Sequence, residues 1–130
     1  MLQYHLLNWR LKMKTATSKD FISMVSEEKP AVCFYHKKEE DAQVKKTKEI
    51  LLKIKKEYVL LPMYEFLTDA NPDNEQLCEV LEIADRPMLI IYKDGCFSRY
   101  KDKKFTEKEI VKFIGNKRLY SPQEKEKINI

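Results

Sequence analysis

The sequence has few cysteines and histidines, and their scarcity excludes several kinds of site. Its three cysteines, Cys33, Cys78 and Cys96, are odd in number and widely spaced, so they predict no disulfide framework. No two of them form a C-x-x-C pair. The only histidines are His5 and His36, so no metal site can be assembled from histidines. We therefore expect free thiols in a reducing compartment, taken as the cytoplasm, and neither a metal nor another cofactor.

Long apolar runs and a strong excess of one charge are also lacking. No stretch approaches the roughly 18 apolar residues of a membrane span. Residues 1–12 lack the basic start, the continuous apolar run and the cleavage site of a signal peptide. The 25 basic and 21 acidic residues leave a net charge of only +4, which is typical of a solvated surface. We expect neither a membrane nor a nucleic acid as the partner.

What the sequence does contain is enough for one folded domain. Its 130 residues are 43% hydrophobic, with seven tyrosines and six phenylalanines, which excludes a disordered chain. We expect an N-terminal extension over residues 1–13, a domain over 14–118 and a polar tail over 119–130. Whether the extension is ordered, or whether Met13 is the natural start, stays open.

Runs of apolar residues alternate with stretches of helical periodicity. Ala31–Tyr35 is a continuous apolar run, which favours a strand buried on both faces. Pro62 interrupts another such run and removes one ladder donor. The predicted strands are Lys14–Thr17, Ala31–Tyr35, Val59–Leu67, Met88–Tyr92 and Cys96–Tyr100. The predicted helices are Ser18–Glu28, Asp41–Tyr58, Glu75–Ile83 and a last one that begins after Thr106 and ends near Gly115.

Each predicted helix has an apolar face at three- and four-residue steps. The predicted buried residues are Phe21, Ile22, Met24 and Val25; Val44, Thr47, Leu51, Ile54 and Tyr58; Leu77, Val80 and Leu81; and Ile110, Val111, Phe113 and Ile114. The lysines of the long helix occupy its other faces and its later turns, where they suit the helix dipole. Anion binding by these lysines remains an alternative.

The order of these elements, β-α-β-α-β-α-β-β-α, predicts a layered α/β fold with helices on both faces of a mixed sheet of four to five strands. It resembles the thioredoxin family, and three segments carry the resemblance. Cys33-Phe34-Tyr35 is similar to the strand that ends in an aromatic pair, and Asp69-Ala70-Asn71-Pro72 to the family's D-x-N-P loop. The segment from Pro87 to Gly95 is similar to the P-T-L-x-x-F-K-x-G segment. The resemblance spans about residues 14–118.

The resemblance also shows where this chain departs from the family. Counting forward from the aromatic pair places the family's C-x-x-C on Glu39, Glu40, Asp41 and Ala42. Cys33 stands where the family has a buried acid. A dithiol oxidoreductase needs a thiolate at a helix N-terminus and a second thiol one turn later, and these positions supply neither. We expect a self-capped helix start.

A groove for an extended peptide is the other feature that the resemblance implies. It would lie between residues 36–42, Asn71-Pro72 and Arg86-Pro87, with Pro87 preceded by a cis bond. Asp85 and Arg86 would pair with the peptide backbone. Arg86 could form a salt bridge with Glu39 and Glu40, or an anion-binding corner.

His36 and the cysteines leave alternatives. We expect His36 to be solvated or to cap the loop, and alternatively to titrate and contact a partner. We expect Cys33 and Cys78 to be buried and Cys96 to be exposed. Cys78 and Cys96 are the thiols that could be reactive.

Two functions from different classes follow. The first is a thioredoxin-like domain without dithiol chemistry that binds a protein or peptide. The second is an atypical thiol oxidoreductase that acts through one cysteine in redox homeostasis. The first predicts no enzyme activity.

Overall fold

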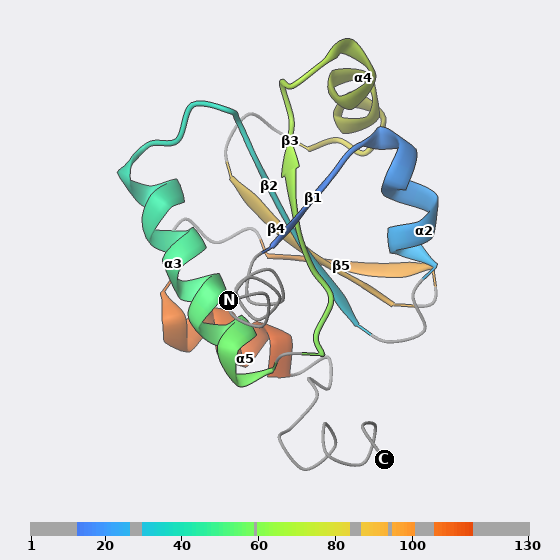
Figure 1. Ribbon diagram of the computed structural model, residues 1–130. Coiled ribbons are helices and arrows are strands. Elements are labelled where there is room, and N and C mark those ends of the chain that lie inside the picture. Colours follow the sequence, from blue (N-terminus) through green and yellow to red (C-terminus); the bar gives the residue numbers. More distant parts are fainter. Residues whose placement is uncertain are drawn as a thin grey trace, which may run out of the picture.

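The computed structural model describes residues 13–26, 30–58, 60–83, 87–93, 95–100 and 106–115 (Figure 1). Nearly all of the expected N-terminal extension and the whole C-terminal tail lie outside these ranges. The order of strands and helices is the predicted one. The elements are β1 (Lys14–Ala16), the 3-10 helix η1 (Ser18–Asp20), α2 (Phe21–Val25), β2 (Ala31–His36), α3 (Ala42–Glu57), β3 (Met63–Leu67), α4 (Pro72–Val80), β4 (Met88–Lys93), β5 (Cys96–Tyr100) and α5 (Glu107–Gly115).

The five strands form one mixed sheet in the order β1-β3-β2-β4-β5. β3 pairs in parallel with β1 and β2, while β4 pairs antiparallel with β2 and β5. All six residues of the central strand β2 are buried. The expectation of an α/β fold with a mixed sheet of four to five strands is therefore confirmed.

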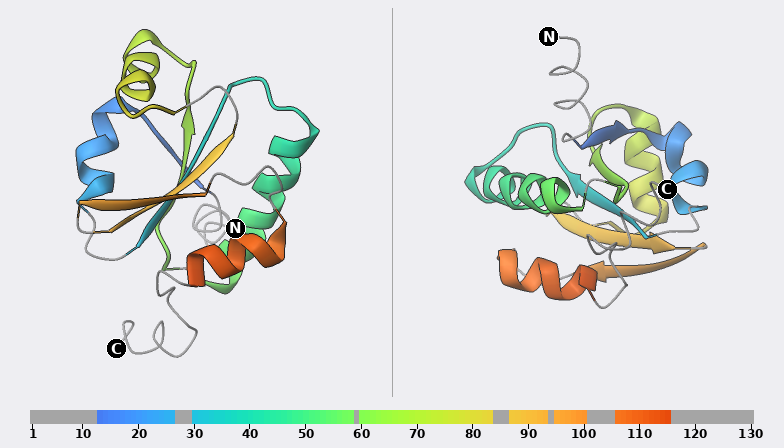
Figure 2. Two further views of the ribbon diagram at one scale, coloured as in Figure 1. Left: turned by 180° about the vertical axis from the view of Figure 1, so that it is seen from behind. Right: turned by 60° about the horizontal axis from the view of Figure 1, so that its bottom comes forward.

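Helices cover both faces of this sheet, and each face has its own core (Figure 2). Because successive side chains of a strand point to opposite faces, β2 contributes to both cores. Val32 and Phe34 pack with residues of α3 and α5, among them Leu51 and Ile110. The opposite core joins β2 to α2 and α4 and contains Ala16, Met24, Cys33, Tyr35, Phe66, Cys78, Ile83, Met88, Ile90 and Tyr92. Within it, the hydroxyl groups of Tyr35 and Tyr92 lie 2.6 Å apart.

β3 is shorter than the predicted strand. It begins at Met63, directly after Pro62, whose carbonyl oxygen accepts a hydrogen bond from the Val32 amide at 2.9 Å. Because proline has no N–H group, the ladder starts only after it. Lys55, which the sequence places on a solvated face of the long helix, is instead buried and donates to the carbonyl oxygen of Leu61 in the turn before the strand.

The helices also differ from the predictions in their bounds and buried faces. The first splits into η1 and the five-residue α2. The predicted helix Glu75–Ile83 is α4, which begins earlier, at Pro72. The Asn71 side chain accepts a hydrogen bond from the Asn74 amide at 2.8 Å there. The helix ends before Glu82, which has a positive φ of 57°. Three residues expected in the core are exposed, namely Ile22 (74%), Val80 (72%) and Val111 (40%). Each is a sequence neighbour of a position that packs against the sheet, and such short helices bury only a narrow stripe.

Candidate functional site

The candidate site lies where the parallel strands β2 and β3 end. Since the carboxyl ends of neighbouring parallel strands meet at one edge of a sheet, the loops that follow them are adjacent. Two hydrogen bonds join these loops. The Thr68 amide donates to the carbonyl oxygen of His36 at 2.9 Å, and the Lys38 amide donates to Oδ1 of Asp69 at 2.8 Å.

The start of α3 faces this edge and holds no thiol. Ala42 is the first residue of the helix, and Asp41 precedes it as N-cap, its Oδ1 accepting from the Val44 amide at 2.8 Å. This carboxylate satisfies one of the unpaired amides and suits the positive end of the helix dipole. The predicted self-capped helix start is confirmed. Glu39 is exposed.

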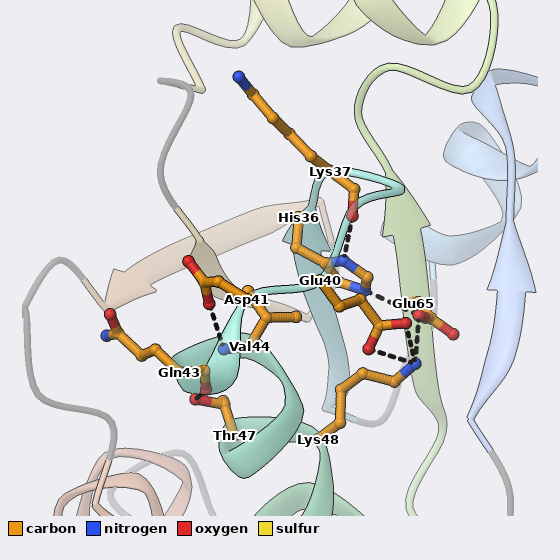
Figure 3. A network of polar contacts seen from close by, with 9 residues as sticks. All are labelled: His36, Lys37, Glu40, Asp41, Gln43, Val44, Thr47, Lys48 and Glu65. Atoms are coloured by element: carbon orange, nitrogen blue, oxygen red, sulfur yellow. Dashed lines mark hydrogen bonds and ion pairs between the residues drawn. The ribbon is translucent and has the colours of Figure 1, made fainter.

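A chain of charged side chains fills the space between the end of β2 and α3 (Figure 3). His36 Nε2 lies 2.7 Å from Oε1 of Glu65, and His36 Nδ1 lies 2.7 Å from the carbonyl oxygen of Lys37. Lys48 Nζ lies 2.8 Å from the same Glu65 oxygen and 3.3 Å from Glu40. We call His36, Glu40, Lys48 and Glu65 the ionic network.

The geometry of the ionic network shifts the pKa values of Glu65 and Lys48. Nδ1 of His36 faces the carbonyl oxygen of Lys37, which can only accept, and Nε2 faces the Glu65 carboxylate, so both ring nitrogens lie against oxygen acceptors. The hydrogen bond from His36, helped by Lys48, outweighs the effect of burial and lowers the pKa of Glu65 from 4.5 to about 2. Burial opposes the charge of Lys48, but its contacts with Glu65 and Glu40 outweigh this and raise its pKa.

The expectation that His36 is solvated is wrong. Its side chain is fully buried and packs against Phe34, with 5.0 Å between the ring centroids. Glu65 and Lys48 were not predicted as site residues. One signal was present: Glu65 is a lone charged residue within an apolar strand, and such a residue needs a partner if it is buried.

A cleft of about 310 Å³ opens between the two loops and α4. It is lined by Lys37, Thr68, Asp69, Glu75, Cys78, Glu79 and Ile83. We call it the α4 cleft. Of these residues only Lys37 lies within the expected bounds of the peptide groove, and the buried His36 can offer such a groove only its backbone. Arg86 lies outside the described residues, so the cis bond before Pro87 and the Arg86 contacts with Glu39 and Glu40 stay predictions.

None of the three cysteines forms a disulfide. Cys33 and Cys78 are buried and Cys96 is exposed, as predicted. Burial raises the pKa of Cys33 far above its ordinary value and that of Cys78 to about 11. Neither buried thiol therefore ionises readily. Within the described ranges, no group of three or more potential ligand side chains could hold a metal ion. No helix there is long and apolar enough to cross a bilayer.

Comparison with solved structures agrees with this architecture. No protein-family model matches the sequence, and no curated protein is significantly similar to it in sequence. Solved structures do match. Thioredoxin f2 of Chlamydomonas reinhardtii has a TM-score of 0.70 at 13% identity, over 82% of this chain and 96% of that one. Fasciola hepatica thioredoxin has a TM-score of 0.69 at 15% identity, over 82% and 100%. Mitochondrial thioredoxin 3 of Saccharomyces cerevisiae, in its oxidised form, has a TM-score of 0.67 at 13% identity, over 80% of this chain and 94% of that one.

The chain therefore has a thioredoxin-like fold. The sequence resemblance is confirmed at the level of architecture, over about four-fifths of the chain. At identities this low the likeness extends to the fold alone, because one fold hosts many functions.

Proposed function

We propose that this protein is a thioredoxin-fold binding module that has no dithiol chemistry and receives an extended polypeptide at the carboxyl edge of β2 and β3. The single observation that carries the proposal is the start of α3. There Glu39 and Ala42 stand at the positions that the resemblance assigns to two cysteines, and Asp41 caps the helix. Without a thiol at this place, the start of α3 has no nucleophile to attack a disulfide.

The test is the reduction of insulin disulfides by the purified protein, with dithiothreitol as the electron donor and a thioredoxin as the positive control. The expected result is no catalysis above the dithiothreitol background. Reduction at a thioredoxin-like rate would overturn the proposal.

One observation favours the second function, in which a lone thiol reacts. Cys96 is exposed at the start of β5. Alkylation by iodoacetamide, followed residue by residue with mass spectrometry, separates the two functions. We expect Cys33 and Cys78 to react only after unfolding, because they are buried, and Cys96 to react in the folded protein no faster than free cysteine. A Cys96 that is alkylated much faster than free cysteine under the same conditions would favour the enzyme.

A further inference from the structure

The walls of the α4 cleft carry more negative than positive charge. Asp69 lies just after β3, and Glu75 and Glu79 lie on α4. All residues that line the cleft lie in the described part of the chain, and Lys37 is the one cationic side chain among them. Figure 3 shows its side chain extending away from the ionic network. Three carboxylates thus face one ammonium group.

The position of Glu79 is not explained by the stability of its own helix. α4 ends at Val80, so Glu79 lies at the negative end of the helix dipole, and the last turn has no basic residue. A carboxylate there is unfavourable, whereas Glu75 in the first turn is favourable. Among the described residues, neither Glu75 nor Glu79 has an ion-pair partner.

Cys78 gives the same cleft an apolar wall. It lies three residues after Glu75 and directly before Glu79, so all three share one side of the helix. Cys78 is only 6% exposed, and no hydrogen-bond partner of its thiol is found in the described part of the chain. Ile83, which is 9% exposed, adds a second apolar surface. The cleft therefore offers a thiol and an aliphatic wall inside, and carboxylates around them.

We propose that the α4 cleft binds a lysine or arginine side chain of a polypeptide partner. This inference rests on the proposed function and names the chemistry of its ligand. The aliphatic stem of such a side chain packs against Cys78 and Ile83 while its charged end pairs with Glu75 and Glu79, which is how long cationic side chains divide between apolar and polar surroundings. The volume of about 310 Å³ lies at the small end of ligand pockets and suits one side chain. A metal ion is the wrong occupant, because the described residues include no suitable ligand group.

The experiment is an NMR titration of the ¹⁵N-labelled full chain with three blocked pentapeptides that differ only in the central residue. That residue is arginine, its uncharged isostere citrulline, or glutamate. We expect the arginine peptide to shift the amide signals of Asp69, Glu75 and Glu79 in a saturable manner, and the other two to bind more weakly. Glu79→Gln should weaken binding of the arginine peptide roughly two- to fivefold, the range that one partly exposed ion pair contributes.

Glu49→Gln is the matched control. It makes the same change on the exposed side of α3 and should leave the arginine affinity unchanged. Equal binding of all three peptides at the cleft would overturn the inference and leave the binding module intact. An arginine peptide that shifts none of these signals, or that is weakened equally by both variants, would overturn it as well. The proposed function is tested separately in the insulin assay, where catalytic reduction of insulin would overturn it.

Discussion

Glu65 is the carboxylate on which the buried charges of this protein converge. Its side chain is 14% exposed, and it contacts both His36 and Lys48 through a single oxygen atom. A buried carboxylate is stabilising only while its hydrogen-bond and ion-pair partners stay in place. The ionic network therefore makes the stability of the protein depend on pH in a window set by Glu65.

We predict that Glu65 causes a loss of stability in acid. Its pKa is about 2 in the folded protein and 4.5 ordinarily, so its contribution is complete above pH 4.5 and is lost as the pH falls toward 2. A difference of this size corresponds to roughly 3 kcal/mol. The measurement is the free energy of unfolding in urea as a function of pH, for the wild type and for Glu65→Gln. The variant should be less stable at neutral pH and should show a flatter acid limb.

Glu107→Gln is the control for this prediction. Glu107 pairs with Lys53 at 3.2 Å, but both side chains are largely exposed, so the variant should change stability by less than about 1 kcal/mol. Parallel acid limbs for the wild type and Glu65→Gln would show that Glu65 is not the group responsible.

Single residues were the hardest feature to predict from the sequence. His36 and Lys55 are polar residues that the structure buries, and neither lies in a pattern that separates it from its exposed neighbours. Their burial depends on oxygen atoms outside their own element, the Glu65 carboxylate on β3 for His36 and the Leu61 carbonyl after the end of α3 for Lys55. The exposed thiol of Cys96 was predictable because it follows a hairpin turn.

At the scale of the elements, the side chain of Asn74 connects α4 to β3 and to η1. It is 1% exposed, and its amide group donates to the carbonyl oxygen of Leu67 at 2.9 Å. Its side-chain oxygen accepts from the Ser18 amide at 3.0 Å. One side chain on α4 thus bonds the end of β3 and the start of η1.

We predict that Asn74→Ala destabilises the protein by about 2–4 kcal/mol, because it leaves the Ser18 amide without its side-chain partner and leaves the Leu67 carbonyl with only the Ala70 amide as donor. The comparison variant is Asn71→Ala, which removes only the N-cap of the same helix and should cost about 1 kcal/mol. Both values come from urea unfolding followed by circular dichroism. Equal effects of the two variants would contradict the connecting role of Asn74.

Long elements were predicted well and short ones poorly. The 16 residues of α3 repeat an apolar face several times, and its buried residues Val44, Thr47, Leu51 and Ile54 were expected, whereas its buried Lys55 was not. α4 has nine residues, and its apolar pattern did not show that Val80 would be exposed. The sheet decides which side of a short helix faces inward, and a short sequence pattern holds too little of that information.

At the scale of the whole molecule, the thioredoxin-like architecture was predictable because order, turns and apolar runs agreed with one another. The candidate site was predictable only as a region. The position that the resemblance assigns to the family's dithiol comes from counting along the chain and stays a prediction, whereas the ionic network and the α4 cleft depend on contacts between β2, β3, α3 and α4.

We predict that the fold still presents the start of α3 as a site for dithiol chemistry. The double variant Glu39→Cys/Ala42→Cys should reduce insulin measurably faster than either single variant, because a thiol near the helix N-terminus is ionised more easily and the second thiol resolves the mixed disulfide. Gln43→Cys/Lys46→Cys, with the same spacing inside the helix, should be inactive. Equal activities of the two double variants would show that residues 39–42 have no special position.

The pair of hydrogen bonds between the loops after β2 and β3 also has a kinetic consequence. The Lys38 and Thr68 amides each donate across the gap, at 2.8 and 2.9 Å, so neither loop can open without the other. We expect the two amide protons to exchange with deuterium at similar, slow rates, since one opening event releases both. In Asp69→Ala, the Lys38 amide should lose its protection. Two unrelated exchange rates in the wild type would mean that the loops open independently.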